Sequence, residues 1–147
     1  MYRKILTVTF GTELSNLAIK QAAQLAKRLG DRLLVLHVRS PLEVPDHAEG
    51  GALSRLGEQK ITEEIAEVER RFLDGAVKLA AAEGVEAETA FIVDLSSHDA
   101  IVRVAQEQQC GLIVMGTRIR HGIEGYFVKS TTQKVLEHTD IPMLLVR

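Results

Sequence analysis

The chain is poor in the residues that stabilise small secreted proteins. It has one cysteine, Cys110, no tryptophan, three prolines and only 4% aromatic residues among its 147 residues. A single cysteine cannot form an internal disulfide, which favours a reducing compartment. No apolar run approaches the roughly 18 residues that a membrane span needs, and the first residues lack the apolar stretch of a signal peptide. We therefore expect a cytoplasmic protein that is not embedded in a membrane.

The chain also lacks an excess of charge of one sign. It has 18 lysines and arginines and 20 aspartates and glutamates, which gives a net charge of −2. Such a balance creates no general field that would attract nucleic acid or an anionic membrane. The hydrophobic fraction of 46% and the charged fraction of 26% are typical of globular proteins. The length predicts one domain, residues 1–147.

Five short apolar runs alternate with helical patterns along the chain. The runs span residues 5–10, 33–38, 89–93, 112–115 and 143–146. Most are continuous, as in strands that are buried on both faces of a sheet. Apolar residues at helical spacing predict a first helix over residues 14–29, with Leu17 on its apolar face, and a second over residues 61–79. Shorter helices are expected with Ser97 and Ser130 as N-caps. This order predicts an α/β fold, a single-domain open five-stranded parallel sheet with helices on both faces.

One segment, Ser40–Gly57, interrupts this alternation. It contains two prolines and three glycines and follows the second predicted strand. It is longer than most connections between a strand and a helix. We interpret it as a mobile loop, and the alternative is a functional flap over a site.

Ligands of open parallel sheets bind at the carboxyl ends of the strands. The residues expected at that edge are Thr9–Thr12, His37–Arg39, Val93–Asp94 and Gly116–Arg118. The last of these begins a glycine-rich stretch that ends in Ser130, Thr131 and Thr132 at the start of the final helix. Free amides at a helix N-terminus bind anions, so Ser130 and Thr131 are candidates for a phosphate site. The alternative is that Ser130 only caps the helix.

Signatures of catalysis and of metal binding are missing. The sequence has no Gly-x-Ser-x-Gly motif, no complete P-loop and no triple-glycine dinucleotide fingerprint. The five histidines are scattered, without the i, i+4 spacing of a zinc helix. Cys110 comes before the fourth predicted strand, where burial as a small apolar residue is expected. Asp94 at a strand end is interpreted as capping the next turn rather than holding a metal.

Nearly the whole chain resembles the universal stress protein family. Residues Arg3–Ser15 are similar to that family's first strand and turn. Residues Cys110–Arg118 are similar to its fourth strand and the start of its phosphate loop, and Thr139–Val146 to its last strand. The resemblance implies a Rossmann-like fold of the adenine nucleotide alpha hydrolase type.

Members of this family that bind ATP share a Gly-x-x-Gly-x9-Gly-Ser/Thr loop. Its positions fall here on Gly116, Ile119, Lys129 and Ser130, so two of the three glycines are missing. The aspartate of binders on the adenine side falls on Phe10. The resemblance implies a candidate nucleotide pocket made of Phe10, Val38, Gly116, Thr117, Arg118, Lys129, Ser130 and Thr131.

The resemblance also implies a homodimer that pairs the last strand, Met143–Val146, antiparallel with its two-fold mate. We therefore expect a cytoplasmic stress-response or regulatory dimer that acts on an unidentified protein partner, without nucleotide cofactor and without catalysis. The alternative is a nucleotide switch or weak ATPase that binds ATP with Mg²⁺. No nucleic-acid partner is expected.

Overall fold

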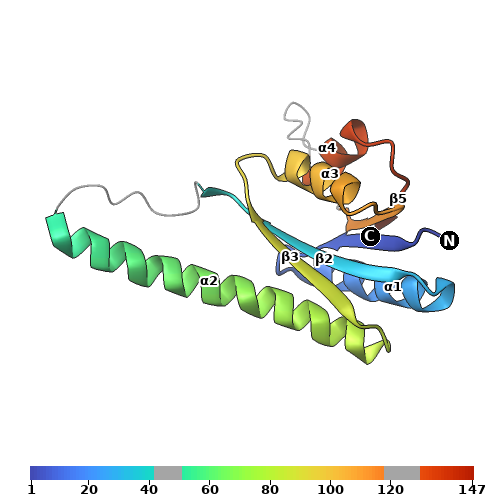
Figure 1. The fold of residues 1–147 in the computed structure, drawn as a ribbon, viewed down its shortest axis with the longest axis horizontal. Coiled ribbons are helices and arrows are strands. Elements are labelled where there is room, and N and C mark those ends of the chain that lie inside the picture. The colour runs from blue at the N-terminus through green and yellow to red at the C-terminus, as the bar shows by residue number, and fades with distance from the viewer. Residues whose placement is uncertain (42–50, 118–129) are drawn as a thin grey trace.

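The predicted open five-stranded parallel sheet is confirmed (Figure 1). A computed structural model describes residues 1–41, 51–117 and 130–147, with backbone alone for residues 51–65. The elements are β1 (Lys4–Val8), α1 (Glu13–Leu29), β2 (Arg32–Arg39), α2 (Gly51–Ala82), β3 (Ala87–Val93), α3 (Ser97–Glu107), β4 (Leu112–Gly116), α4 (Thr131–His138) and β5 (Met143–Val146). The strand order is β3-β2-β1-β4-β5, and all neighbouring pairs are parallel.

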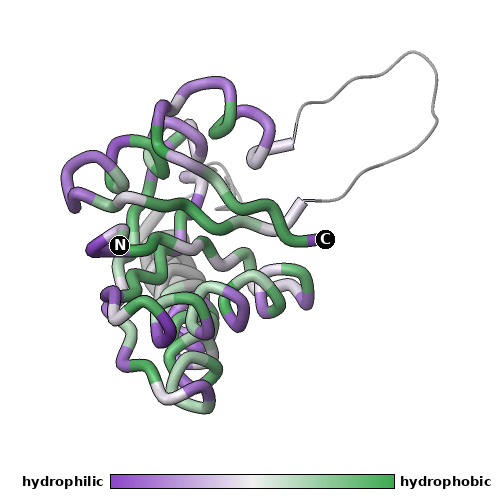
Figure 2. The backbone as a smooth tube through the Cα atoms, turned by 90° about the vertical axis from the view of Figure 1, so that its right-hand side faces the viewer, coloured by the Kyte–Doolittle hydropathy of each residue, from purple (hydrophilic) through white to green (hydrophobic). Residues whose placement is uncertain are grey.

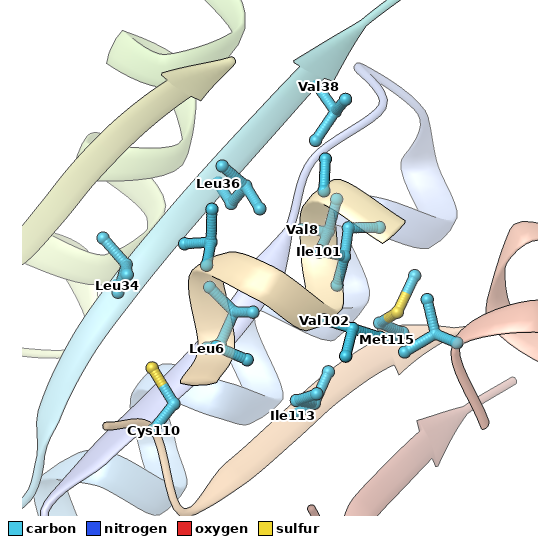
Figure 3. Packing of buried hydrophobic residues seen from close by; sticks show 14 residues of the cluster. Leu6, Val8, Leu34, Leu36, Val38, Ile101, Val102, Cys110, Ile113 and Met115 are labelled. Carbon is cyan, nitrogen blue, oxygen red and sulfur yellow. The ribbon is translucent and has the colours of Figure 1, made fainter. Parts of the chain in front are cut away.

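Helices cover both faces of this sheet, because successive side chains of a strand point to opposite faces. On one face, Leu6 and Val8 of β1 pack with residues of α3 and α4, and Figure 3 shows the strand and α3 side chains meeting. On the other face, Ile5 packs with residues of α1 and α2. Cys110 is buried in the first cluster as predicted, and burial raises the pKa of its thiol.

The three inner strands are more deeply buried than the two edge strands. The residues of β1 are all buried, and β2 and β4 are buried along most of their length, which explains their continuous apolar sequences. In Figure 2 the strands are mostly green, the colour of hydrophobic residues. The edge strand β3 is different, because Phe91 and Val93 are exposed on it. Continuity of an apolar run therefore did not distinguish edge strands from buried ones.

Helix α1 has a capping residue at each end. The side chain of Thr12 accepts a hydrogen bond from the Ser15 amide, and Gly30 ends the helix with φ +69°. The predicted apolar face is partly wrong, because Leu17 is 50% exposed. The buried stripe includes Ile19 and Ala23 instead. A stripe rich in alanine lets the helix lie close to the sheet, and Leu17 then falls on the outer side.

Two helix starts differ from the predictions. Part of the predicted loop Ser40–Gly57 is helical, because α2 begins at Gly51, and residues 42–50 lie outside the described residues. Glycine costs about 1 kcal/mol within a helix, which the strong helix formers between Gly51 and Gly57 offset. In α3 the N-cap is Ser96 rather than Ser97, and its carbonyl accepts the first helical hydrogen bond, from Ala100. No helix in the described part of the chain is both long and apolar enough to span a bilayer.

Candidate functional site

The chain reverses its order in the sheet between β1 and β4. Strands β2 and β3 lie on one side of β1, and β4 and β5 lie on the other. Ligands of open parallel sheets bind at the carboxyl ends of the strands at such a point. Here this crevice is formed by the turn Phe10–Thr12 after β1, by Gly116 and Thr117 at the end of β4, and by the start of α4.

The start of α4 is held next to the end of β4. The Thr132 hydroxyl donates a hydrogen bond of 2.8 Å to the Gly116 carbonyl. Ser130 is the N-cap, as predicted: its hydroxyl accepts from the Gln133 amide at 3.2 Å, and the Gln133 side chain accepts from the Ser130 amide at 3.2 Å. This reciprocal cap confirms the capping interpretation of Ser130. The Thr131 and Thr132 amides have no acceptor within the helix, because the first amides of any helix lack one.

The turn after β1 satisfies its own amides. Phe10 N–H donates to the Ser15 hydroxyl at 3.0 Å, and Gly11 N–H donates to the Thr9 hydroxyl at 3.2 Å. The Ser15 amide in turn donates to the Thr12 hydroxyl at 3.1 Å. These two amides at the end of β1 are thus engaged inside the turn, while the Phe10 side chain is exposed beside it.

Two glycines at this edge are required by close packing. An added Cβ at Gly11, which has φ +70°, would lie 2.5 Å from the Phe72 ring of α2. An added Cβ at Gly116 would lie 2.5 Å from Leu14 Cγ of α1. Gly116 falls on the first glycine position of the family's ATP loop. In this chain the close packing against Leu14 is by itself a reason for glycine at this position.

The structure brings only some of the predicted pocket residues together. The structure brings together Gly116, Thr117 and the start of α4, where Ser130 and Thr131 lie. The Thr117 amide donates to the Val146 carbonyl at 2.7 Å. Val38 is buried in the core on the α3 and α4 side, so only its backbone is left for a ligand. Arg118 and Lys129, together with Ile119, lie outside the described residues.

Sequence reasoning missed a cluster around the buried side chains of His37 and Glu69 at the end of β2, called here the His37 cluster. It consists of His37 and Arg39 of β2, Glu69 and Phe72 of α2, and Phe91 of β3. His37 Nε2 lies 3.8 Å and Arg39 Nε lies 3.3 Å from the same Glu69 carboxylate oxygen. The signal in the sequence was the spacing of two between His37 and Arg39, which places both on the α2 face of β2.

Two histidines that are scattered in the sequence meet in the fold. The rings of His98 and His138, from α3 and α4, have centroids 4.8 Å apart.

Asp94 caps the turn before α3 as predicted: its carboxylate accepts from the Ser96 amide at 2.9 Å and from Arg103 at 3.1 Å. These two hydrogen bonds lower the pKa of Asp94. Within the described part of the chain, no three His, Cys, Asp or Glu side chains are grouped as metal ligands.

Comparison with known proteins identifies the family. All 147 residues match the model of the Universal stress protein family. The chain therefore belongs to this family. It is 33% identical over 151 residues to the "Universal stress protein in QAH/OAS sulfhydrylase 3'region" of Thermus aquaticus, with both chains fully covered.

Solved structures of other universal stress proteins have the same fold. One, in complex with cAMP, has a TM-score of 0.77 and 21% identity, and the match covers 99% of this chain and 97% of that one. Another, from Archaeoglobus fulgidus in complex with dAMP, has a TM-score of 0.67 and 22% identity, and the match covers 100% and 98%. The two neighbours share with this protein the parallel sheet whose crevice is described above.

Proposed function

We propose that this universal stress protein is a cytoplasmic regulatory protein of the stress response that acts as a homodimer on a protein partner, without ATP and without turnover. The observation that carries the proposal is the apolar open edge of β5. Leu144 and Leu145 are 40% and 41% exposed there. Figure 2 shows the segment that leads to the C-terminus in green. An open apolar edge favours pairing with another strand.

The hydrogen bonds of β5 indicate which backbone groups are available for a partner strand. The carbonyls of Pro142 and Val146 accept from the Ile113 and Thr117 amides on the β4 side. Backbone groups alternate in direction along a strand, so those of Met143 and Leu145 point to the open edge. Antiparallel pairing across a two-fold axis would satisfy them in both copies.

An exposed leucine on α4 supports the same interface. Leu136 is exposed, and it lies two residues, or about 200°, around α4 from His138, which contacts α3. Leu136 is thus on the side of α4 away from α3. Because α3 packs over β2, which β1 and β4 separate from β5, we place this side of α4 toward the β5 edge. Pairing of β5 would therefore bury leucines from the strand and from the helix together.

The geometry of the crevice supports independence from ATP. Phe10 stands where ATP-binding members have an aspartate, and the Phe10 and Gly11 amides are engaged within their own turn. The Ser130 hydroxyl and amide are engaged in the capping box. At the start of α4, this leaves the Thr131 and Thr132 amides for a phosphate.

A second candidate function is a nucleotide switch or weak ATPase that binds ATP with Mg²⁺ in the same crevice. It is favoured by the two neighbours of the same fold, one in complex with cAMP and the other with dAMP. In this chain the Thr131 and Thr132 amides would hold a phosphate at the positive end of the α4 dipole.

One preparation separates the two functions. Mass spectrometry of the denatured, purified protein measures bound adenine nucleotide, and light scattering behind a sizing column measures its mass. We expect nucleotide far below one per chain and a mass twice the 16.2 kDa of the monomer. Near-stoichiometric ATP would favour the nucleotide switch. A mass of 16.2 kDa at all loadings would overturn the dimer.

A further inference from the structure

The His37 cluster connects α2 to three strands through one imidazole. His37 packs edge-on against Phe72 of α2, with ring centroids 5.5 Å apart, and stacks on Phe91 of β3 at 5.8 Å. Its Nδ1 lies 2.8 Å from the Thr9 carbonyl at the end of β1. The side chains of both His37 and Glu69 are 8% exposed. A change in the charge of this ring would therefore act directly on contacts with α2 and with the end of β1.

The hydrogen bond to Thr9 fixes the tautomer of His37. A carbonyl can only accept, so Nδ1 carries the proton. In the neutral ring, Nε2 then presents a lone pair toward the Glu69 carboxylate, 3.8 Å away, and no hydrogen bond can form. Protonation of His37 places an N–H at this position. The contact between β2 and α2 then changes from two acceptors that oppose each other to a charge-assisted pair.

The Glu69 carboxylate has acceptor capacity left for this proton. Arg39 Nε is within ion-pair distance of it, but this nitrogen is buried and makes no hydrogen bond to the described residues. The groups that meet His37 come from every neighbouring element: Glu69 and Phe72 from α2, Arg39 from β2, the Thr9 carbonyl beyond β1, and Phe91 from β3.

The groups around His37 act on a charged ring in opposite directions. The positive charge of Arg39 and the burial of His37 oppose protonation. The Glu69 carboxylate, the Thr9 carbonyl and the stacked face of Phe91 all interact more strongly with an imidazolium than with a neutral ring. Arg39 also lies over the Phe91 ring, with its guanidinium carbon 5.9 Å from the ring centroid.

We propose that protonation of His37 strengthens the attachment of α2 to the sheet, so that a fall in pH fastens α2 across the carboxyl ends of β1 and β2. Phe72 of α2 covers Gly11 beside the crevice, so fastening α2 also fixes that wall of the crevice. Histidine in general is the side chain whose charge changes between about pH 5 and 8, so the test below covers that range.

Hydrogen exchange tests the proposal on the whole chain. Protection factors, already corrected for the intrinsic pH dependence of exchange, are measured for α2 amides of residues 69–80 at about pH 5.5 and about pH 8. We expect α2 protection to be about tenfold higher at the lower pH, relative to α1, as one charge-assisted hydrogen bond would give. Protection that is unchanged or lower at acidic pH would overturn the proposal.

Variants locate the response. Glu69→Gln removes the anion and His37→Gln removes the titrating ring, so both should abolish the pH difference in α2. His98→Gln, in the histidine pair between α3 and α4, is the matched control and should keep it. A difference that survives His37→Gln would refute the assignment. If that variant does not fold, imidazole ¹⁵N NMR of the wild type decides, because Nδ1 must stay protonated throughout while Nε2 gains a proton; titration of Nδ1 would equally refute it.

Discussion

Asp31 organises the chain before β1 through a single carboxylate. It accepts hydrogen bonds from the Tyr2 amide at 2.9 Å and from the Arg3 amide at 3.0 Å. Arg3 has φ +67°, a left-handed conformation that costs roughly 1–2 kcal/mol for a residue with a Cβ. The hydrogen bonds of Asp31 thus hold the chain in a conformation that Arg3 would not adopt alone, and they lead it into β1.

The charge of Asp31 should make this contribution dependent on pH. Burial raises the pKa of Asp31, but the hydrogen bonds from the Tyr2 amide, the Met1 amino group and the Arg3 amide, with the positive charge of that amino group, outweigh it and leave the pKa below its usual value. A lowered pKa contributes stability above the unfolded-state pKa of about 3.9, and this is lost as the pH falls through the folded-state pKa. Asp31→Asn should therefore lower the free energy of unfolding clearly at neutral pH and progressively less below about pH 4.

Urea unfolding of wild type and Asp31→Asn across this pH range measures the effect. Asp74→Asn, at an exposed position of α2, is the control for a general change in net charge. A destabilisation by Asp31→Asn that is equal at neutral and acidic pH would show that the carboxylate acts by shape rather than by charge.

At the scale of elements, features that depend on neighbouring residues could be predicted from the sequence, and features that depend on contacts between distant residues could not. The helix of residues 14–29 and the cap at Ser130 follow from nearby residues, so they could be predicted. The exposure of Leu17 could not be predicted, because it depends on how α1 lies on the sheet. The His37 cluster joins residues of β2 to Glu69 on α2 and to Phe91 on β3, and no local pattern records such a meeting. The candidate crevice was predicted in position from topology alone, but not the internal hydrogen bonds of its turn.

The end of α3 offers a prediction about helix termination. Gln109 follows the helix with φ +55°, and the Cys110 amide donates back to the Ala105 carbonyl at 2.8 Å. Gly30 performs the same role after α1 at φ +69° without strain. Gln109→Gly should raise the free energy of unfolding by about 0.5–1 kcal/mol, because glycine adopts this conformation without a steric cost but loses more entropy on folding.

Chemical denaturation measures this gain. Gly30→Ala is the matched variant and should lower stability by about 1 kcal/mol, since it introduces the strain that Gln109→Gly removes. Destabilisation by Gln109→Gly would mean that the exposed glutamine side chain makes a contribution larger than the backbone strain.

At the scale of the whole molecule, the two edges of the sheet differ in chemistry. The β3 edge carries Glu88, which is bonded to Lys4 and Arg32, and charged residues discourage pairing with another chain. The β5 strand, Met143–Val146, has no polar side chain. The β3 edge also exposes Phe91 and Val93, so the difference between the edges is the charge of Glu88 rather than a lack of apolar residues on β3. A protein with charge on one edge and none on the other can close into a two-fold dimer through the uncharged edge.

The direction of backbone groups in β5 yields a test that separates pairing from folding. Leu145 presents its N–H to the open edge, so Leu145→Pro should remove one interface hydrogen bond in each copy and keep the bonds between β4 and β5. Two lost hydrogen bonds should weaken dimerisation by about 1–3 kcal/mol, measured by sedimentation across a dilution series. Leu145→Ala keeps the N–H and controls for the side chain. Leu144→Pro should instead lower folding stability, because the Leu144 N–H is directed toward β4. A Leu145→Pro dimer as tight as wild type would move the interface from the strand to the helices.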